Sequence, residues 1–103
     1  MEIRKKENDH RFVLYDGEKE IGYLFYDVED NGDWIAEHTV VDEAYGGQGL
    51  ARKLVEALID EAKQQEIRVR PVCSYVKKVF SADPERVKTI WKKTNENGSK
   101  INK

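Results

Sequence analysis

The apolar positions along the chain predict two kinds of element, a long helix and several strands. Between residues 47 and 65, apolar side chains recur every four residues, at Leu50, Leu54, Leu58 and Ala62. This spacing places them on one stripe of an α-helix, while mostly charged side chains fill the opposite face. The stripe must be covered by another layer of the fold, so we expect this helix to pack on a sheet.

Three segments before the predicted helix have the apolar content and spacing of strands, at residues 11–15, 20–28 and 34–41. The dipeptides Asp16-Gly17 and Asn31-Gly32 between them are typical of tight turns, so we expect an antiparallel meander. The middle strand is apolar on both faces, which predicts burial of both. One of its faces is expected to carry Ile21, Tyr23 and Phe25, and the other Leu24, Tyr26 and Val28.

The segments after the helix complete the predicted fold. Residues 67–72 form a short strand in this interpretation, and a crossover connection would place it parallel to the third strand. Helices are expected at residues 74–80 and 84–93, and Pro84 is well suited to open the second one. Residues 95–103 are polar and predict a flexible tail. We therefore expect a single α/β domain of the α+β kind over residues 1–94.

Composition narrows the classes of function. One cysteine among 103 residues excludes an internal disulfide framework and fits a reducing compartment, so we expect a cytoplasmic protein. No apolar run is long enough to span a membrane, and we expect no membrane partner. A net charge of −2 gives no general case for binding nucleic acid. The segment from Asp16 to Glu43, however, contains ten carboxylates and a single lysine. Such an acidic surface would either attract cationic partners such as amines or simply be solvated.

Three glycines fall within four residues and run straight into the periodic apolar segment, in Gly46-Gly47-Gln48-Gly49. The first N–H groups of a helix have no partner within it and favour an anion, and glycine lets a ligand approach the backbone closely. A nucleotide P-loop would need Gly-Lys-Ser/Thr, and a dinucleotide fingerprint would need a glycine where Arg52 stands, so both are excluded. A phosphate-binding loop and a turn without a ligand remain as alternatives.

The segment from His38 to Pro84, about half of the chain, resembles the GNAT acetyltransferase superfamily, specifically its short single-domain members with a cysteine after the last strand. The likeness rests on the runs EHTVVDEAYGGQGLARKLVEALIDEAKQQ and RPVCSYVKKVFSADPE. In that superfamily the motif [Gln/Arg]-x-x-Gly-x-[Gly/Ala] holds the pyrophosphate of acetyl-coenzyme A, and here it aligns with residues 46–51. Gly46 departs from the motif, because arginine or glutamine is usual at that position.

The resemblance implies a set of site residues. The cofactor would be bound by Val40, Val41, Gly46, Gly47, Gln48, Gly49, Leu50 and Ala51, with Lys77 near the nucleotide phosphates. Cys73 would accept the acetyl group or protonate the leaving thiolate, and His38 would act as a base. Without the resemblance, a lone cysteine is most often a buried apolar residue and a lone strand histidine is usually just hydrogen-bonded. No metal site is expected.

Together these features predict an N-acetyltransferase that moves acetyl from acetyl-coenzyme A to a small-molecule amine or a basic peptide, as a monomer or weak dimer. The acetyl group would pass either through Cys73 or directly to the amine. Two alternatives stay open. One is a coenzyme A binding module without catalysis, which Gly46 makes reasonable. The other is an interaction domain that uses residues 77–103, where eight basic side chains stand against three acidic ones.

Overall fold

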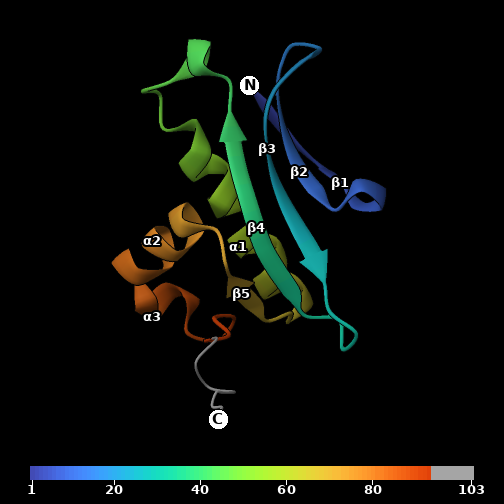
Figure 1. The fold of residues 1–103 in the computed structure, drawn as a ribbon, viewed down its shortest axis with the longest axis vertical. Coiled ribbons are helices and arrows are strands. Elements are labelled where there is room, and N and C mark those ends of the chain that lie inside the picture. The colour runs from blue at the N-terminus through green and yellow to red at the C-terminus, as the bar shows by residue number, and fades with distance from the viewer. Residues whose placement is uncertain (94–103) are drawn as a thin grey trace.

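The structure, a computed structural model, describes residues 1–93, which form a mixed five-stranded sheet with helices packed against it (Figure 1). The sheet has the order β1-β2-β3-β4-β5. Its strands are β1 (Glu2–Lys6), β2 (Arg11–Asp16), β3 (Lys19–Val28), β4 (Trp34–Val41) and β5 (Val69–Pro71). Strands β1 to β4 pair antiparallel, and β5 pairs parallel with β4. The predicted antiparallel meander followed by a parallel last strand is therefore confirmed.

The helical elements are α1 (Leu50–Gln65), α2 (Ser74–Ala82) and α3 (Pro84–Val87), with short 3₁₀ turns η1 (Glu7–Asp9) and η2 (Glu43–Tyr45). Helix α1 passes behind β4 in Figure 1 and buries the stripe that its spacing predicts. Leu54 and Leu58 have no exposed surface, and they join Phe12, Leu24 and Trp34 of the sheet in one core cluster. Burying each such leucine stabilises the fold by about 1.5–3 kcal/mol, so this interface holds α1 in place.

Helix α1 begins at Leu50, three residues later than the spacing predicts. Gly47 and Gly49 have φ angles of +78° and +71°, which a right-handed helix cannot contain. At the other end Glu66 takes a φ of +57°, and the Ile67 N–H then donates to the Ala62 carbonyl at 2.9 Å. This left-handed cap ends the helix and uses residues that the sequence assigned to a strand, so β5 starts only at Val69.

Strand β1 is an addition to the predicted sheet. Its five residues include one apolar side chain, Ile3, which packs half-buried against the core, while Lys5 bonds Glu61 of α1 at 3.1 Å. The strand forms because its backbone pairs with β2, and its charged side chains protect the free edge of the sheet from pairing with other chains. The antiparallel part of the sheet therefore has four strands, where the sequence predicted three.

The predicted placement of Ile21 is wrong. Leu14 and Tyr15 pair with Gly22 and Glu20, which leaves Ile21 as an extra residue in a β-bulge. The bulge turns Ile21 into the core, where it is 2% exposed, instead of placing it beside Tyr23 and Phe25. Those two aromatic residues lie on the other face and are only half-buried, so the expected burial of both faces is incomplete.

The predicted helix over residues 84–93 is wrong after its first turn. Helix α3 ends at Val87, and Trp91 then pairs with Val69 as a parallel bridge. The Val69 N–H donates to Ile90 at 2.6 Å, and the Val69 carbonyl accepts from Lys92 at 2.8 Å. Pairing with β5 satisfies these backbone groups at the free side of the sheet, which a continued helix would have left open.

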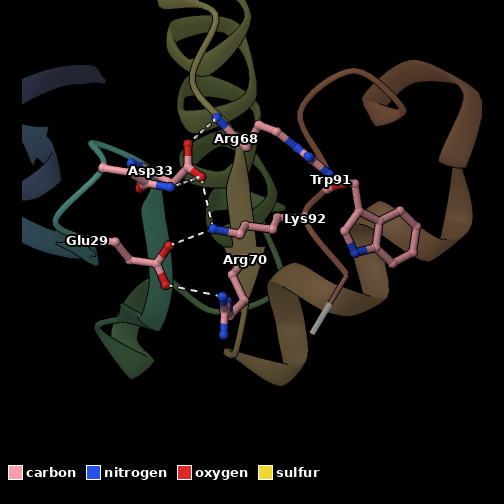
Figure 2. A network of polar contacts seen from close by, with 7 residues as sticks. Glu29, Asp33, Arg68, Arg70, Trp91 and Lys92 are labelled. Carbon is pink, nitrogen blue, oxygen red and sulfur yellow. Dashed lines mark hydrogen bonds and ion pairs between the residues drawn. The ribbon is translucent and has the colours of Figure 1, made fainter. Parts of the chain in front are cut away.

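Six residues tie the turn between β3 and β4 to β5 and to the C-terminal part of the described chain (Figure 2). Lys92 Nζ lies 2.9 Å from both Glu29 Oε1 and Asp33 Oδ2, and Arg70 pairs with Glu29 at 3.2 Å. The backbone N–H of Arg68 also donates to Asp33, at 3.3 Å, and its guanidinium donates to the Trp91 carbonyl at 3.0 Å. The network fixes the end of the sheet where β4 and β5 are paired.

This architecture confirms the predicted α+β fold class. The proposed tail, residues 95–103, lies outside the described residues. Within residues 1–93, no helix is long and apolar enough to cross a membrane.

Candidate active site

Strands β4 and β5 separate after three paired residues. Their register ends at Ala36 and Pro71, and the Ala36 carbonyl then accepts from the N–H groups of Val72 and Cys73, at 3.0 and 2.8 Å. From Cys73 the chain turns away into α2. In residues 1–93, nothing pairs with β4 on this side beyond Ala36, so the rest of the strand offers an open backbone edge.

The direction of the backbone groups on this edge follows from the pairing with β3. The Asp42 N–H donates to Ile21 at 2.8 Å, and the Val40 carbonyl lies close to Gly22, so both residues turn toward β3. Because backbone groups alternate along a strand, those of Thr39 and Val41 point to the opposite side. The open edge therefore presents free donors and acceptors to an extended ligand in the gap that β5 leaves.

The glycine loop lies between this edge and α1. Gly47 and Gly49 need glycine for their positive φ, and a Cβ at either position would have no atom of the described residues within 4 Å, apart from its chain neighbours. Gly46 differs, with a φ of −65° that any residue can adopt, and a Cβ there would lie 3.3 Å from the Glu43 carbonyl. The loop is thus open to a ligand at the two positions where its backbone is left-handed.

The amides of this loop are available to an anion. Within the described chain, the N–H groups from Gly47 to Arg52 donate no hydrogen bond, and α1 has neither a capping side chain nor an acidic residue in its first turn. A 16-residue helix directs the positive end of its dipole at the same point. Lys53 adds a positive charge nearby, while Arg52 is paired with Glu56 at 3.2 Å. These residues fit a pyrophosphate group.

Cys73 lies at the head of α2, half-buried, beside the open edge of β4. Its Sγ is 3.5 Å from Oγ1 of Thr39, which is its one polar side-chain partner among residues 1–93. The sequence reasoning did not select Thr39. Strand alternation could have identified it, because Thr39 and Val41 share a face, and Val41 packs against the core.

His38 lies on the other face of β4. The strand has a bulge at Glu37, so that His38 pairs with Phe25 while Ala36 pairs with Tyr26. The imidazole is exposed and stacks on the Phe25 ring, with centroids 6.3 Å apart. The structure therefore does not bring His38 into hydrogen-bond contact with Cys73, although both residues border the edge of β4.

The remaining predicted residues differ in how far they are exposed. Val40 is 45% exposed, on the face of His38, whereas Val41 is half-buried. Leu50 is buried and holds the start of α1 on the core, while Gln48 is exposed and Ala51 half-buried. Lys77 is exposed one turn into α2, and its N–H donates to the Cys73 carbonyl at 3.0 Å.

A separate groove of about 650 Å³ lies between β1 and the outer side of α1. It is lined in part by Ile3, Leu14 and Ala57, and it reaches the glycine loop at Gln48 and Leu50. It contains neither Cys73 nor Thr39, so it is distinct from the open edge of β4. Across residues 1–93, no group of three or more potential metal ligands comes together.

A sheet whose fourth and fifth strands separate beside a glycine loop and helix start defines a protein of the GCN5-related N-acetyltransferase fold. The family model described as GCN5-related N-acetyl-transferase matches residues 11–90. The chain therefore belongs to the GCN5-related N-acetyltransferase family, as the sequence resemblance implied.

Individual relatives match a smaller part of the chain than the family model does. The bovine protein NATD1 is 33% identical over 48 residues, which cover 47% of this chain and 42% of that protein. An L-methionine sulfoximine/L-methionine sulfone acetyltransferase of Salmonella typhimurium is 34% identical, over 59% of this chain and 46% of that enzyme. The chain thus spans less than half the length of these two relatives.

The fold has a close structural counterpart. The solution structure of a GCN5-like protein from Staphylococcus aureus superposes with a TM-score of 0.69 and 22% identity, covering 96% of this chain and 95% of that one. A ribosomal-protein-alanine N-acetyltransferase from Brucella melitensis has a TM-score of 0.55 and 16% identity, over 71% of this chain and 59% of that one. At these identities the likeness concerns the fold alone.

Proposed function

We propose that this protein is an N-acetyltransferase that takes acetyl from acetyl-coenzyme A and transfers it to a cationic amine. The observation that carries the proposal is the meeting of the open edge of β4 with the unpartnered amides of the glycine loop. A pyrophosphate on the amides from Gly47 to Ala51 would leave an extended pantetheine arm free to follow the edge at Thr39 and Val41. Lys77 would approach the nucleotide phosphates.

The faces occupied by Cys73 and His38 support direct transfer. In this route the amine first loses its extra proton to solvent, and its neutral nitrogen then bonds to the thioester carbon as the carbon–sulfur bond breaks. The proton that the nitrogen must still lose passes to His38, which releases it to solvent. The coenzyme A thiolate leaves and takes a proton from Cys73, which regains one from solvent. Having His38 and Cys73 on opposite faces of β4 suits this division of roles, because the acid and the base then act on opposite sides of the reacting carbon.

The alternative route passes through an acetylated Cys73, whose sulfur would displace coenzyme A before the amine attacks it. Intact mass after rapid acid quench distinguishes the two routes. Direct transfer predicts no acetyl-protein and residual turnover in Cys73→Ala. A mass increase of one acetyl group that is lost in this variant, together with complete loss of turnover, would establish the covalent route instead.

Charges around the open edge support a cationic acceptor. Among the described residues, Glu37, Asp42 and Glu43 form no ion pair, and all three lie on β4 or between β4 and the glycine loop. Unpaired carboxylates there would raise the local concentration of a polyamine or a lysine-rich peptide. We expect kcat/KM to fall with ionic strength for such acceptors, and an unchanged kcat/KM would argue against this substrate class.

Calorimetric titration with acetyl-coenzyme A tests the cofactor site. Wild-type protein is expected to bind, and Gly49→Val is expected to lose binding because the new side chain would occupy the opening and strain a left-handed residue. Gly32→Val is the matched control, since Gly32 also has a positive φ and open space but lies in the turn between β3 and β4. No binding by the wild type, or equal binding by Gly49→Val, would refute the proposed site.

A second function is favoured by Gly46, which cannot supply the side-chain contact that the family motif places there. The protein would then bind coenzyme A without catalysis and act as a sensor. This function predicts binding in the titration but no amine-dependent release of free thiol with any acceptor.

We further propose that the protein is cytoplasmic, that it is a monomer or a weak dimer, and that it uses neither nucleic acid nor membrane as a partner. Sedimentation of the pure protein would test the oligomeric state.

A further inference from the structure

Tyr45, the residue directly before the glycine loop, makes a hydrogen bond that the proposed chemistry does not use. Its hydroxyl donates to Oδ2 of Asp16 at 2.7 Å, across 29 residues of sequence. Asp16 ends β2 at the tight turn that Gly17 forms with a φ of +64°. The Lys19 ammonium, on the other side of this turn, lies 5.8 Å from the centre of the Tyr45 ring.

We propose that the hydrogen bond between Tyr45 and Asp16 positions the glycine loop for the phosphates of the cofactor. Tyr45 is thus a positioning residue, and the inference rests on the proposed binding of acetyl-coenzyme A.

The loop itself has few contacts that could hold it. Residues 46–49 are all exposed, and apart from chain neighbours no atom of residues 1–93 lies within 4 Å of the Cβ position of either left-handed glycine. Its conformation therefore depends on the residues at its two ends. At the helix end, Leu50 is 5% exposed and packs in the core. At the other end, the Tyr45 ring is half-buried against the core, and its hydroxyl is held by Asp16.

The hydrogen bond between Tyr45 and Asp16 also holds η2 in place. Within η2, the first residues are held by a cap of their own. Asp42 Oδ1 accepts from the Ala44 N–H at 2.9 Å, and the Tyr45 and Gly46 N–H groups donate to Asp42 and Glu43. These bonds hold η2 together as a compact unit at the end of β4. Among residues 1–93, only the contact of Tyr45 with the turn between β2 and β3 ties this unit to another part of the sheet by a hydrogen bond between side chains.

A backbone amide binds an anion more tightly when its N–H already points at the binding position, because the entropy cost of ordering the loop otherwise opposes binding. Removing the Tyr45 hydroxyl leaves the ring packed but removes the side-chain hydrogen bond that ties η2 to the turn between β2 and β3. Such a change would weaken phosphate binding while the fold and the reacting groups stay in place.

The experiment measures the Kd of acetyl-coenzyme A together with thermal stability and steady-state kinetics. In Tyr45→Phe we expect the Kd and the KM for acetyl-coenzyme A to rise about fivefold, with kcat and the melting temperature close to those of the wild type. Asp16→Ala is expected to reproduce this effect. Asp16→Asn should rescue binding, because an amide oxygen can still accept from the hydroxyl. Tyr23→Phe is the matched control, since no hydrogen bond of the Tyr23 hydroxyl occurs in the described chain.

The outcomes separate this inference from the proposed function. A wild type that does not bind acetyl-coenzyme A overturns both. A wild type that binds, with an unchanged Kd in Tyr45→Phe or with the same loss in Tyr23→Phe, overturns the positioning role alone. A fall in kcat at constant KM would also overturn it, and failure of Asp16→Asn to restore binding would show that the hydrogen bond is not the cause.

Discussion

Asp33 offers the sharpest test of how the sheet is held together at the end where β4 meets β5. Its carboxylate accepts from Lys92 Nζ at 2.9 Å, from Asn31 Nδ2 at 3.1 Å and from the backbone N–H of Arg68 at 3.3 Å (Figure 2). The Asp33 and Lys92 side chains are 18% and 22% exposed, so water screens their contact only in part. We predict that Asp33→Asn destabilises the protein.

The size of the effect follows from these contacts. A hydrogen bond to a charged group contributes about 1.5–3 kcal/mol when it is well protected. Lys92 keeps Glu29 as a second partner at 2.9 Å, and the asparagine oxygen can still accept from the backbone. We therefore expect a loss of about 1–2 kcal/mol in the free energy of unfolding, equivalent to a melting temperature lower by about 5–10 °C for a domain of this size.

The effect should depend on pH. Partial burial alone would raise the pKa of Asp33, but hydrogen bonds from Lys92 and from the Arg68 backbone outweigh it and lower that pKa. A carboxyl with a lowered pKa in the folded state stabilises the protein above its unfolded pKa and loses that contribution as pH falls through the folded value. The difference between wild type and Asp33→Asn should be full above about pH 4 and shrink at lower pH.

Urea denaturation of both proteins between pH 7 and pH 3 measures this difference. Asp30→Asn is the matched control, because Asp30 lies in the same turn, is exposed and forms no ion pair among residues 1–93. A destabilisation of equal size in the control, or one that persists unchanged at pH 3, would refute the account of the Asp33 carboxylate given by the structure.

Two further predictions concern α1. Glu66→Gly should raise the free energy of unfolding by about 0.5–1 kcal/mol, because glycine takes the φ of +57° at this helix end without steric strain. Equilibrium denaturation measures this change, and a loss of stability would contradict the prediction. Leu58→Ala should destabilise by about 2–5 kcal/mol, because Leu58 is fully buried and a cavity would remain. Gln64→Ala, exposed on the same helix, should change stability little in the same assay, and equal losses would refute the packing argument.

Local pattern predicted the elements that carry their own signal. Helix α1 repeats its leucines every four residues, and the strands β2 to β4 have enough apolar side chains to be found one by one. The glycine loop was also predictable, since glycines permit the positive φ angles and the close approach of a ligand that other residues would hinder. The family resemblance then singled out Cys73, directly after the last strand, and His38, within the third predicted strand, as candidate site residues.

Other features depended on contacts that no single segment contains. β1 has one apolar side chain and forms a strand because β2 offers it a partner. The segment after α3 pairs with β5 because that side of the sheet is free, although its sequence suits a helix. In each case the backbone hydrogen bonds to a distant strand outweighed the local preference.

The amino-acid sequence by itself determined the succession from β2 to α2, the apolar stripe of α1 and the presence of a glycine-rich loop before it, because these depend on neighbours within a few residues. Only the tertiary structure decided which side chains share a face. The bulge at Glu37 turned His38 toward Phe25, and strand separation brought Thr39 to Cys73. One extra residue in a β-ladder moves the side chains that follow it to the opposite faces of the sheet, and pairing with the neighbouring strand decides where that extra residue lies.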